Sequence, residues 1–307
     1  MADVILSLLP VFALILLGAL LRRFALLTPE GWMALERITY FVLFPPVLFM
    51  SIIGGSFAGE ETARMALALG LANLAMSALM ILIRPLLPAT GAQFSSIFQA
   101  GLRWNSYVAL GVITSLMGKP GVALAAVAFA VMVPLNNLFS VLVITRYASH
   151  APAPIGKIAR SIAANPLIIA TLSGIFFAIF AIPLPKPAED ILNLLGQGTV
   201  AVGLLCVGAA LDFGSMGSAK AGLAAGVILR VAVMPALTFG LCLLMGVSHQ
   251  ALLVGLITVS APVATSAYIL ARQLGGDATL MANLTTLTTL ASLVSMPAAI
   301  LIAGAIN

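Results

Sequence analysis

The chain has 307 residues, of which 62% are hydrophobic and only 7% are charged. A soluble domain carries about 25% charged residues, so this composition excludes a water-facing surface and predicts a protein surrounded by lipid. The formal net charge of +5 does not indicate nucleic-acid binding, because the basic residues are scattered singly between apolar runs. We therefore expect the lipid bilayer, and no nucleic acid, as the partner of most of the surface.

Ten apolar segments follow one another along the chain, each near the roughly 20 residues that a membrane-spanning helix needs. They lie at about residues 3–21, 33–54, 64–87, 92–117, 121–145, 163–183, 191–211, 219–246, 250–273 and 279–304. The first segment begins with Asp3 where a signal peptide would carry positive charge, so we interpret it as a retained span. The sequence thus predicts an all-α polytopic membrane protein with ten transmembrane helices.

Lysine and arginine are distributed unevenly between the two predicted sides of the membrane. With the N-terminus outside, nine lie on or near the cytoplasmic side: Arg22, Arg23, Arg37, Arg84, Arg146, Lys157, Arg160, Lys220 and Arg272. Three lie outside: Arg64, Lys119 and Lys186. Because cytoplasmic loops carry the excess of basic residues, we expect both termini outside.

A faint internal repeat divides the chain near its middle. Tyr107 and Pro134 in the first half correspond to Tyr268 and Pro297 in the second half at a nearly constant offset. Five spans per copy is an odd number, so the second copy must be inverted in the membrane. We expect a first repeat at 1–147, a cytoplasmic linker at 148–162, and an inverted second repeat at 163–307. Inverted repeats are typical of secondary transporters, whose site lies near the midplane.

The fourth span, at 92–117, has an unusually polar centre. It carries four polar residues in close succession: Arg103, Asn105, Ser106 and Tyr107. Irregular backbone at membrane depth is tolerated only where it lines a cavity, so we predict that this helix is interrupted beside a binding site. The span has no proline between Pro88 and Pro120, and Gly111 is therefore expected to supply the flexibility.

The ninth span, at 250–273, is the partner of the fourth in the second half. Pro262 lacks an N–H group and should break or kink this helix. Three polar residues follow it: Thr265, Ser266 and Tyr268. Breaking both spans exposes half-helix N-termini, whose partial positive charge and free N–H groups suit an anion.

Four further polar residues in the spans need an explanation. Asn136 and Asn137 interrupt the fifth span and are expected to support the break in the fourth. Arg103 either faces a cavity or extends to the membrane interface. Arg230 lies deep in the eighth span and either pairs with an acid such as Asp212 or adds positive potential for an anion.

Residues typical of enzymes and metal sites are missing from the sequence. No Ser–His–Asp arrangement, metal-ligand spacing or P-loop is present, and Cys206 and Cys242 lie inside apolar segments where core packing explains them. We therefore expect no enzyme, no metal and no cofactor. The fourth and ninth spans also contain no acidic residue, which argues against a sodium cage or a carboxylate proton relay within them.

Several segments resemble the auxin efflux carrier family, also called the membrane transport protein family. They are RWNSYVALG, VPLNNLFSVL, NPLIIATLSGIFF and SAPVATSAYILARQLGGD with the later TLTTLASLVSMP, and the resemblance covers essentially the whole chain. The NSY and SAYILARQ segments look most similar to bacterial members of malonate or related dicarboxylate type.

The resemblance implies a division of labour between the helices. Spans one, two, six and seven would form a scaffold and the surface of a homodimer. Spans three to five and eight to ten would form a moving transport unit. Spans four and nine would be broken and would cross near the substrate, at about 105–113 and 261–268.

We therefore expect a secondary active transporter of small organic anions, malonate-like dicarboxylates or other carboxylic acids, with an elevator-type alternating-access mechanism. The residues expected to donate hydrogen bonds to the substrate are Asn105, Ser106, Thr265 and Ser266. Tyr107 and Tyr268 are expected to wall the site, Pro262 to be part of it, and Arg103 or Arg230 to add positive potential. We expect the protein in a cell inner membrane of bacterial type. Two alternatives remain at this point: a sodium-coupled symporter of bile-acid type, and a membrane receptor or assembly subunit that transports nothing.

Overall fold

The computed structural model describes residues 2–54, 60–148, 163–212 and 220–305, together with residues 156 and 160. The predicted linker at 148–162, Lys157 included, therefore lies almost entirely outside the described residues. Within them, the first half contains α1 (Ala2–Arg23), α2 (Pro29–Ile38), η1 (Thr39–Leu43), α3 (Phe44–Ile53), α4 (Glu60–Ile83), η2 (Arg84–Leu86), α5 (Gly91–Leu102) and α6 (Ser106–Tyr147). The second half contains α8 (Pro166–Ile179), α9 (Lys186–Gln197), α10 (Thr199–Ala209), α11 (Lys220–Ile228), η3 (Leu229–Val233), α12 (Met234–Leu244), α13 (His249–Ser260), α14 (Thr265–Leu274) and α15 (Ala278–Gly304).

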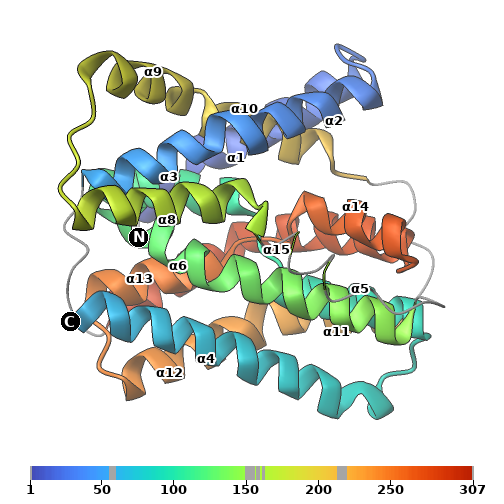
Figure 1. The fold of residues 1–307 in the computed structure, drawn as a ribbon. Coiled ribbons are helices and arrows are strands. Elements are labelled where there is room, and N and C mark those ends of the chain that lie inside the picture. Colours follow the sequence, from blue (N-terminus) through green and yellow to red (C-terminus); the bar gives the residue numbers. More distant parts are fainter. Residues whose placement is uncertain are drawn as a thin grey trace.

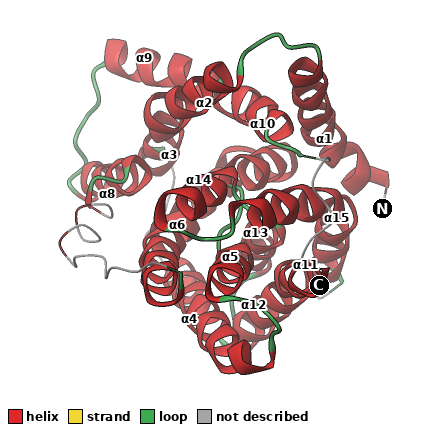
Figure 2. Cartoon of the chain, turned by 90° about the vertical axis from the view of Figure 1, so that its right-hand side faces the viewer, coloured by secondary structure: helices red, strands yellow, loops and turns green. Residues whose placement is uncertain are grey.

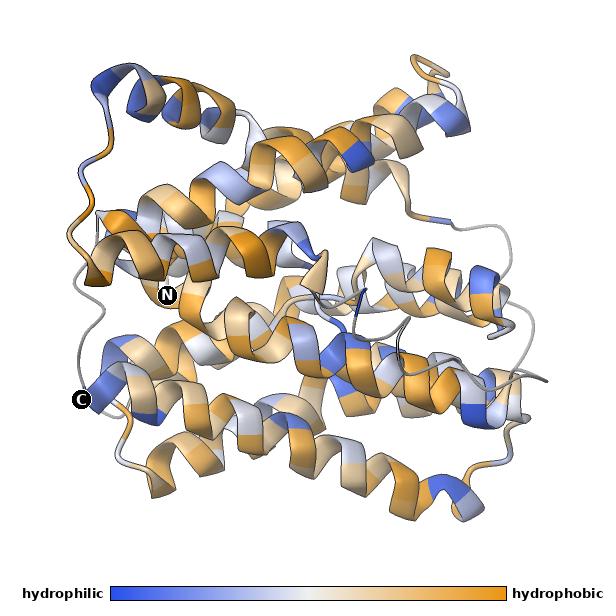
Figure 3. Ribbon diagram, viewed as in Figure 1, coloured by the Kyte–Doolittle hydropathy of each residue, from blue (hydrophilic) through white to orange (hydrophobic). Residues whose placement is uncertain are grey.

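Six helical stretches of the described chain are long and apolar enough to cross a bilayer. They are Pro29–Ile53, Glu60–Leu86, Ser106–Tyr147, Lys186–Ala209, Lys220–Leu244 and Ala278–Gly304, and α8 and α13 are shorter apolar helices. Hydrophobic colours cover most of the helix lengths in Figure 3, and hydrophilic residues gather at the helix ends and in the middle of the molecule. The described fold is therefore that expected of a polytopic membrane protein, while the ten-span inverted repeat stays a prediction.

Local sequence signals fix where several helices begin. The Thr28 hydroxyl accepts a hydrogen bond from the Gly31 N–H (3.1 Å) just before α2. The Asp277 carboxylate accepts from the Leu280 N–H (2.9 Å) at the start of α15. Side-chain acceptors at this position satisfy N–H groups that lack an intrahelical partner.

The long helix α6 is two helices joined at Gly118. This glycine has φ 59° and ψ −148°, a backbone conformation that a residue with a Cβ atom rarely adopts. The chain folds back at this glycine. A hydrogen bond from Asn136, in the later part of α6, to the Leu102 carbonyl just before the helix begins (3.0 Å) shows this. The fold-back brings Asn136 and Asn137 next to the polar stretch that begins at Arg103.

The helices gather in two groups that face each other. Helices α1, α2, α3, α8, α9 and α10 form the upper group in Figure 1, and α4, α5, α6 and α11–α15 form the lower group. The same division is visible after a rotation of 90° (Figure 2). Contacts of α6 with α1, α3, α8 and α10 connect the groups. The division of the helices into a scaffold and a transport unit, implied by the resemblance, stays a prediction.

The two described chain ends lie at the same end of the helical bundle, at the left of Figure 1. The ends of α1, α6 and α14 lie at the opposite end. Their last turns carry basic residues, namely Arg22, Arg23, Arg146 and Arg272. This arrangement agrees with the predicted separation of basic residues from the termini; which side faces the cytoplasm stays a prediction.

Candidate functional site

Two stretches of non-helical backbone meet where the helix groups face each other. Trp104, between α5 and α6, pairs with Val263, between α13 and α14, in an antiparallel bridge. The Asn105 N–H donates to the Pro262 carbonyl (2.7 Å), and the Ala264 N–H donates to the Arg103 carbonyl (3.0 Å). Each interrupted helix thus satisfies main-chain groups of the other, which is what membrane depth requires of irregular backbone. The predicted interruptions are present, and they pair directly; we name this region the crossing.

The first interruption lies earlier than expected, and Asn105 explains its position. Residues Arg103 and Asn105 have extended backbone angles, with ψ 107° and 108°. The Asn105 side-chain oxygen accepts from the N–H groups of Tyr107 (3.1 Å) and Val108 (3.2 Å), so the asparagine caps α6. Gly111, expected to provide the flexibility, lies inside the helix and packs near Val200. The prediction that Gly111 supplies the flexibility was wrong, because the helix begins again at the Asn105 cap and Gly111 lies within it.

The second interruption follows from Pro262, as predicted. Ala261 precedes the proline and has extended angles (φ −62°, ψ 148°), since a residue before proline is pushed out of the helical region. Helix α14 then begins after Ala264, and no side chain caps its N-terminus. The first N–H groups of α14 therefore remain open to another acceptor.

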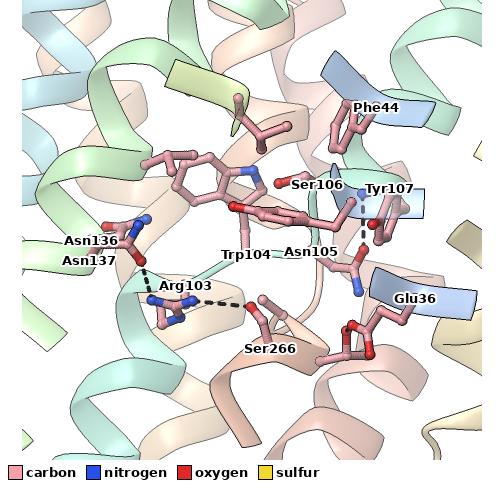
Figure 4. Close-up of a pocket in the computed structure, with 15 residues that line it drawn as sticks. Glu36, Phe44, Arg103, Trp104, Asn105, Ser106, Tyr107, Asn136, Asn137 and Ser266 are labelled. Atoms are coloured by element: carbon pink, nitrogen blue, oxygen red, sulfur yellow. Dashed lines mark hydrogen bonds between the residues drawn. The ribbon is translucent and has the colours of Figure 1, made fainter. Parts of the chain in front are cut away.

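A cavity of ≈ 60 Å³ lies at the crossing, between the two helix groups (Figure 4). Its lining comes from both groups: Glu36, Tyr40, Phe44, Arg103, Trp104, Asn105, Ser106, Tyr107, Val133, Asn136, Asn137, Leu167, Ala264, Thr265 and Ser266. The structure thus brings together six of the eight predicted substrate-binding residues. A space of this size holds a few water molecules or a very small organic molecule.

Arg103 is the cation of this cavity. Its guanidinium donates to the Asn137 side-chain oxygen (2.6 Å) and to the Ser266 hydroxyl (3.1 Å), as the dashed lines in Figure 4 show. The ion pairs of the described residues involve only Arg64 and Lys186, so none of them neutralises Arg103. A charge at membrane depth is costly and requires compensation. The side chain faces the cavity instead of extending to the membrane interface.

Three buried donor atoms in the cavity lining have no hydrogen-bond partner. They are Arg103 Nε, Trp104 Nε1 and the Tyr107 hydroxyl. The Tyr107 ring is held in place by Phe44, with ring centroids 5.3 Å apart, and by close contact with Gly203, where a Cβ atom would lie 2.4 Å from the ring. An unsatisfied buried polar atom costs roughly 1–3 kcal/mol, so an acceptor placed in the cavity would be stabilised.

Seven lining residues were not predicted from the sequence: Glu36, Tyr40, Phe44, Trp104, Val133, Leu167 and Ala264. Glu36 is the most consequential, because it adds a carboxyl group to the cavity and accepts a hydrogen bond from the Thr265 hydroxyl. The signal for Glu36 was its place in the apolar stretch Pro29–Ile53, where an acid is costly. The Tyr40 hydroxyl accepts from the Asn165 amide (3.1 Å).

Of the remaining predicted residues, Asn136 and Asn137 line the small cavity, whereas Tyr268, Pro262 and Arg230 do not. Tyr268 is 36% exposed and lines a different and larger cavity of ≈ 620 Å³. Pro262 contributes its carbonyl to the crossing but does not line the small cavity. Asn136 lines it and also accepts from the Asn73 amide (2.6 Å). Arg230 is fully buried behind the crossing, where each of its three nitrogens donates to a main-chain carbonyl.

The small cavity lies between two larger ones. Glu36 and Thr265 line both the small cavity and the one of ≈ 620 Å³, which also contains Arg22 and Arg272 from the basic end of the bundle. A cavity of ≈ 900 Å³ lies toward the other end and is lined by Val47 among others.

Two groups of side chains lie at the edges of the small cavity. Phe44, Trp104 and Tyr107 line it and form an aromatic cluster with Phe129, in which neighbouring ring centroids lie 5.3–6.2 Å apart. On the basic side the Glu36–Thr265 pair forms the boundary. The small cavity thus shares the Glu36–Thr265 pair with the cavity of ≈ 620 Å³, whereas it shares no lining residue with the cavity of ≈ 900 Å³.

The fold and the site together define a polytopic helical membrane protein with a small polar cavity at the crossing of two interrupted helices. Residues 151–300 match the sequence model of a family described as membrane transport protein. This match includes α13, α14 and Arg230, and it leaves Arg103–Tyr107 outside. No curated protein matches the sequence.

Proposed function

We propose that this protein is a secondary transporter of small organic anions, with one carboxylate bound in the cavity at the crossing. The observation that carries the proposal is the set of unsatisfied donors around Arg103, a buried cation with no ion-pair partner among the described residues. A carboxylate accepts several hydrogen bonds and matches the planar guanidinium. The open N-terminus of α14 adds a partial positive charge on the same side.

The proposed substrate is a monocarboxylate in preference to a malonate-like dicarboxylate. The cavity contains one arginine, which offers one site for a carboxylate, and the carboxyl group of Glu36 lies in the same small space. A second negative charge on the ligand would face Glu36 at short range, where like charges repel strongly in a poorly solvated site. The volume of ≈ 60 Å³ also favours a very small acid.

Alternating access would use the two larger cavities as routes to the two sides of the membrane. The Glu36–Thr265 contact connects the two helix groups, because Glu36 belongs to α2 and Thr265 to α14. Movement of one group against the other would break this contact and open the small cavity toward the basic end. An elevator-type motion and a homodimer through the upper group of helices are part of this proposal.

A binding screen on the purified protein tests the proposal. Propionate, malonate and propanamide share a chain of three carbons and carry one, two and no negative charges. A ligand that binds only the folded state raises its apparent stability. We expect stabilisation by propionate, less by malonate and none by propanamide, and we expect Glu36→Gln to increase the response to malonate. Equal stabilisation by the amide and the acids would contradict an anion site.

A further inference from the structure

Arg230 lies behind the crossing and contacts neither the small cavity nor the two larger ones. It belongs to η3, between α11 and α12, and its side chain is 0% exposed. Its Nε and one terminal nitrogen donate to the Ala261 carbonyl (2.8 and 2.6 Å), and the other terminal nitrogen donates to the Gly101 carbonyl (3.4 Å). One guanidinium therefore joins the two interrupted helices from a third helix.

The carbonyls that Arg230 contacts lie at the C-terminal ends of half-helices. Gly101 is in the last turn of α5, and Ala261 directly follows α13. The last carbonyls of a helix have no intrahelical partner and carry a partial negative charge, so two converging ends create a site that favours a cation. The next carbonyl of α5, that of Leu102, accepts from the Asn136 amide (3.0 Å).

Carriers with broken helices use this kind of site for a coupling ion. Half-helix C-terminal ends and unwound carbonyls coordinate Na⁺ or a proton in such transporters. Here a covalently attached cation already occupies the converging ends, with the negative ends of two helices compensating its charge. A free Na⁺ ion would compete with Arg230 for the same oxygen atoms.

We propose that Arg230 is a fixed cation that holds the ends of α5 and α13 together and replaces a mobile coupling cation at the crossing. It is a positioning residue, because it acts on the substrate cavity through the main chain of the crossing. The replacement of a coupling cation rests on the proposed transport function, whereas the role of Arg230 in holding the ends of α5 and α13 together does not. Transport would then be independent of sodium.

The first experiment measures thermal stability of the purified wild-type chain in sodium chloride against choline chloride at equal ionic strength, with no substrate present. We expect the same melting temperature in both salts. The variant Arg230→Gln should melt at a lower temperature in choline, and sodium should restore part of the loss, because the freed carbonyls then accept a mobile cation. Arg230→Lys keeps a cation and should show no response to sodium.

Arg22→Gln is the matched control for this experiment. Arg22 also donates to carbonyls at a helix end, those of Ala209 (2.6 Å) and Leu211 (3.0 Å) at the end of α10, but not to the backbone of the crossing. We expect no sodium response in this variant. A general loss of stability would lower the melting temperature of both glutamine variants equally in the two salts. If Arg230→Gln melts at the same lowered temperature in sodium and in choline, Arg230 is not a fixed cation in place of a mobile one.

The second experiment measures propionate uptake into proteoliposomes with and without sodium. We expect equal rates for the wild type and a loss of about ten- to a hundredfold for Arg230→Gln, which leaves buried carbonyls unpaired, with substantial recovery in Arg230→Lys. Sodium-dependent uptake or sodium-dependent stability of the wild type would overturn the proposal. Absence of any propionate uptake, together with unchanged stability in the two salts, would contradict the proposed function and leave the role of Arg230 at the helix ends intact.

Discussion

The two interruptions at the crossing differ in how the helix that follows each of them begins. The α6 end is capped by its own residue, Asn105, whereas the α14 end has no side-chain cap. The first interruption supplies the cation Arg103, and the second supplies open N–H groups and the Ser266 hydroxyl, which accepts from Arg103. An anion between them would contact a charge from one half of the chain and a free helix end from the other.

This difference explains why the two halves are not interchangeable in the proposed site. If both N-termini were capped, Arg103 alone would hold the ligand. If both were open, two partial positive charges and an arginine would meet in a cavity of ≈ 60 Å³. One cap and one open end give a site for a single carboxylate, with the Glu36 carboxyl group at its boundary.

Removing the charge should have the largest effect on this arrangement. Arg103→Gln retains polar groups near Asn137 and Ser266 but loses the cation. Hydrogen bonds to charged groups contribute roughly 1.5–3 kcal/mol each, so the loss of two should weaken propionate binding by about a hundredfold or more. Thermal stabilisation by propionate measures the change, and Arg146→Gln at the end of α6 is the control outside the cavity. Unchanged binding in a folded Arg103→Gln variant would exclude the proposed site.

Changing the cap without destroying it tests the asymmetry itself. Asn105→Asp keeps an acceptor for the Tyr107 and Val108 N–H groups, so its melting temperature should stay near that of the parent. The added negative charge should repel a carboxylate and lower propionate affinity by at least about tenfold. Asn105→Ala should instead destabilise the protein by about 0.5–2 kcal/mol through loss of the cap.

If Asn105→Asp binds propionate as the parent does, the anion does not lie near the N-terminus of α6, and the proposed contribution of this helix end to the site is wrong. Equal stability of Asn105→Ala and the parent would show that the cap contributes little. The two variants therefore separate a structural role of Asn105 from a role in binding.

The smallest expected effect concerns the two tyrosines. Tyr107→Phe removes an unpartnered buried hydroxyl, so the unfolding free energy should not fall. Propionate affinity should fall by about tenfold, the lower end of the range for one hydrogen bond to a charged group. Tyr268→Phe is the matched change outside the small cavity and should leave affinity unchanged. A larger loss in Tyr268→Phe than in Tyr107→Phe would favour a site in the cavity of ≈ 620 Å³.

The sequence was sufficient to predict the helical membrane architecture and both interruptions. Polar residues at membrane depth are costly, and this cost makes Arg103–Tyr107 and Pro262–Ser266 conspicuous among apolar neighbours. Pro262 located its break correctly, because the restriction on the preceding residue is local. The cap by Asn105 is equally local, and recognising it would have placed the first break at 103–105 instead of at Gly111.

Other features depend on how distant segments pack and were not predictable from one sequence. Tyr268 follows Ser266 by two positions, and residues at that spacing do not share a face of a helix, so the tyrosine points away from the small cavity. Glu36 reaches the cavity only because α2 packs beside the crossing. Arg230 was expected to pair with an acid such as Asp212 or to add positive potential for an anion, whereas it donates hydrogen bonds to the Gly101 and Ala261 carbonyls of two other helices.

Counterflow in proteoliposomes tests whether the protein transports a small carboxylate that binds at Arg103. Vesicles with the purified protein are loaded with unlabelled propionate, and uptake of a trace of labelled propionate is followed. We expect transient accumulation with the wild type, none with Arg103→Gln, and none when propanamide replaces propionate inside the vesicles. Counterflow that persists in Arg103→Gln, or its absence for every small carboxylate with the folded wild-type protein, would contradict this expectation.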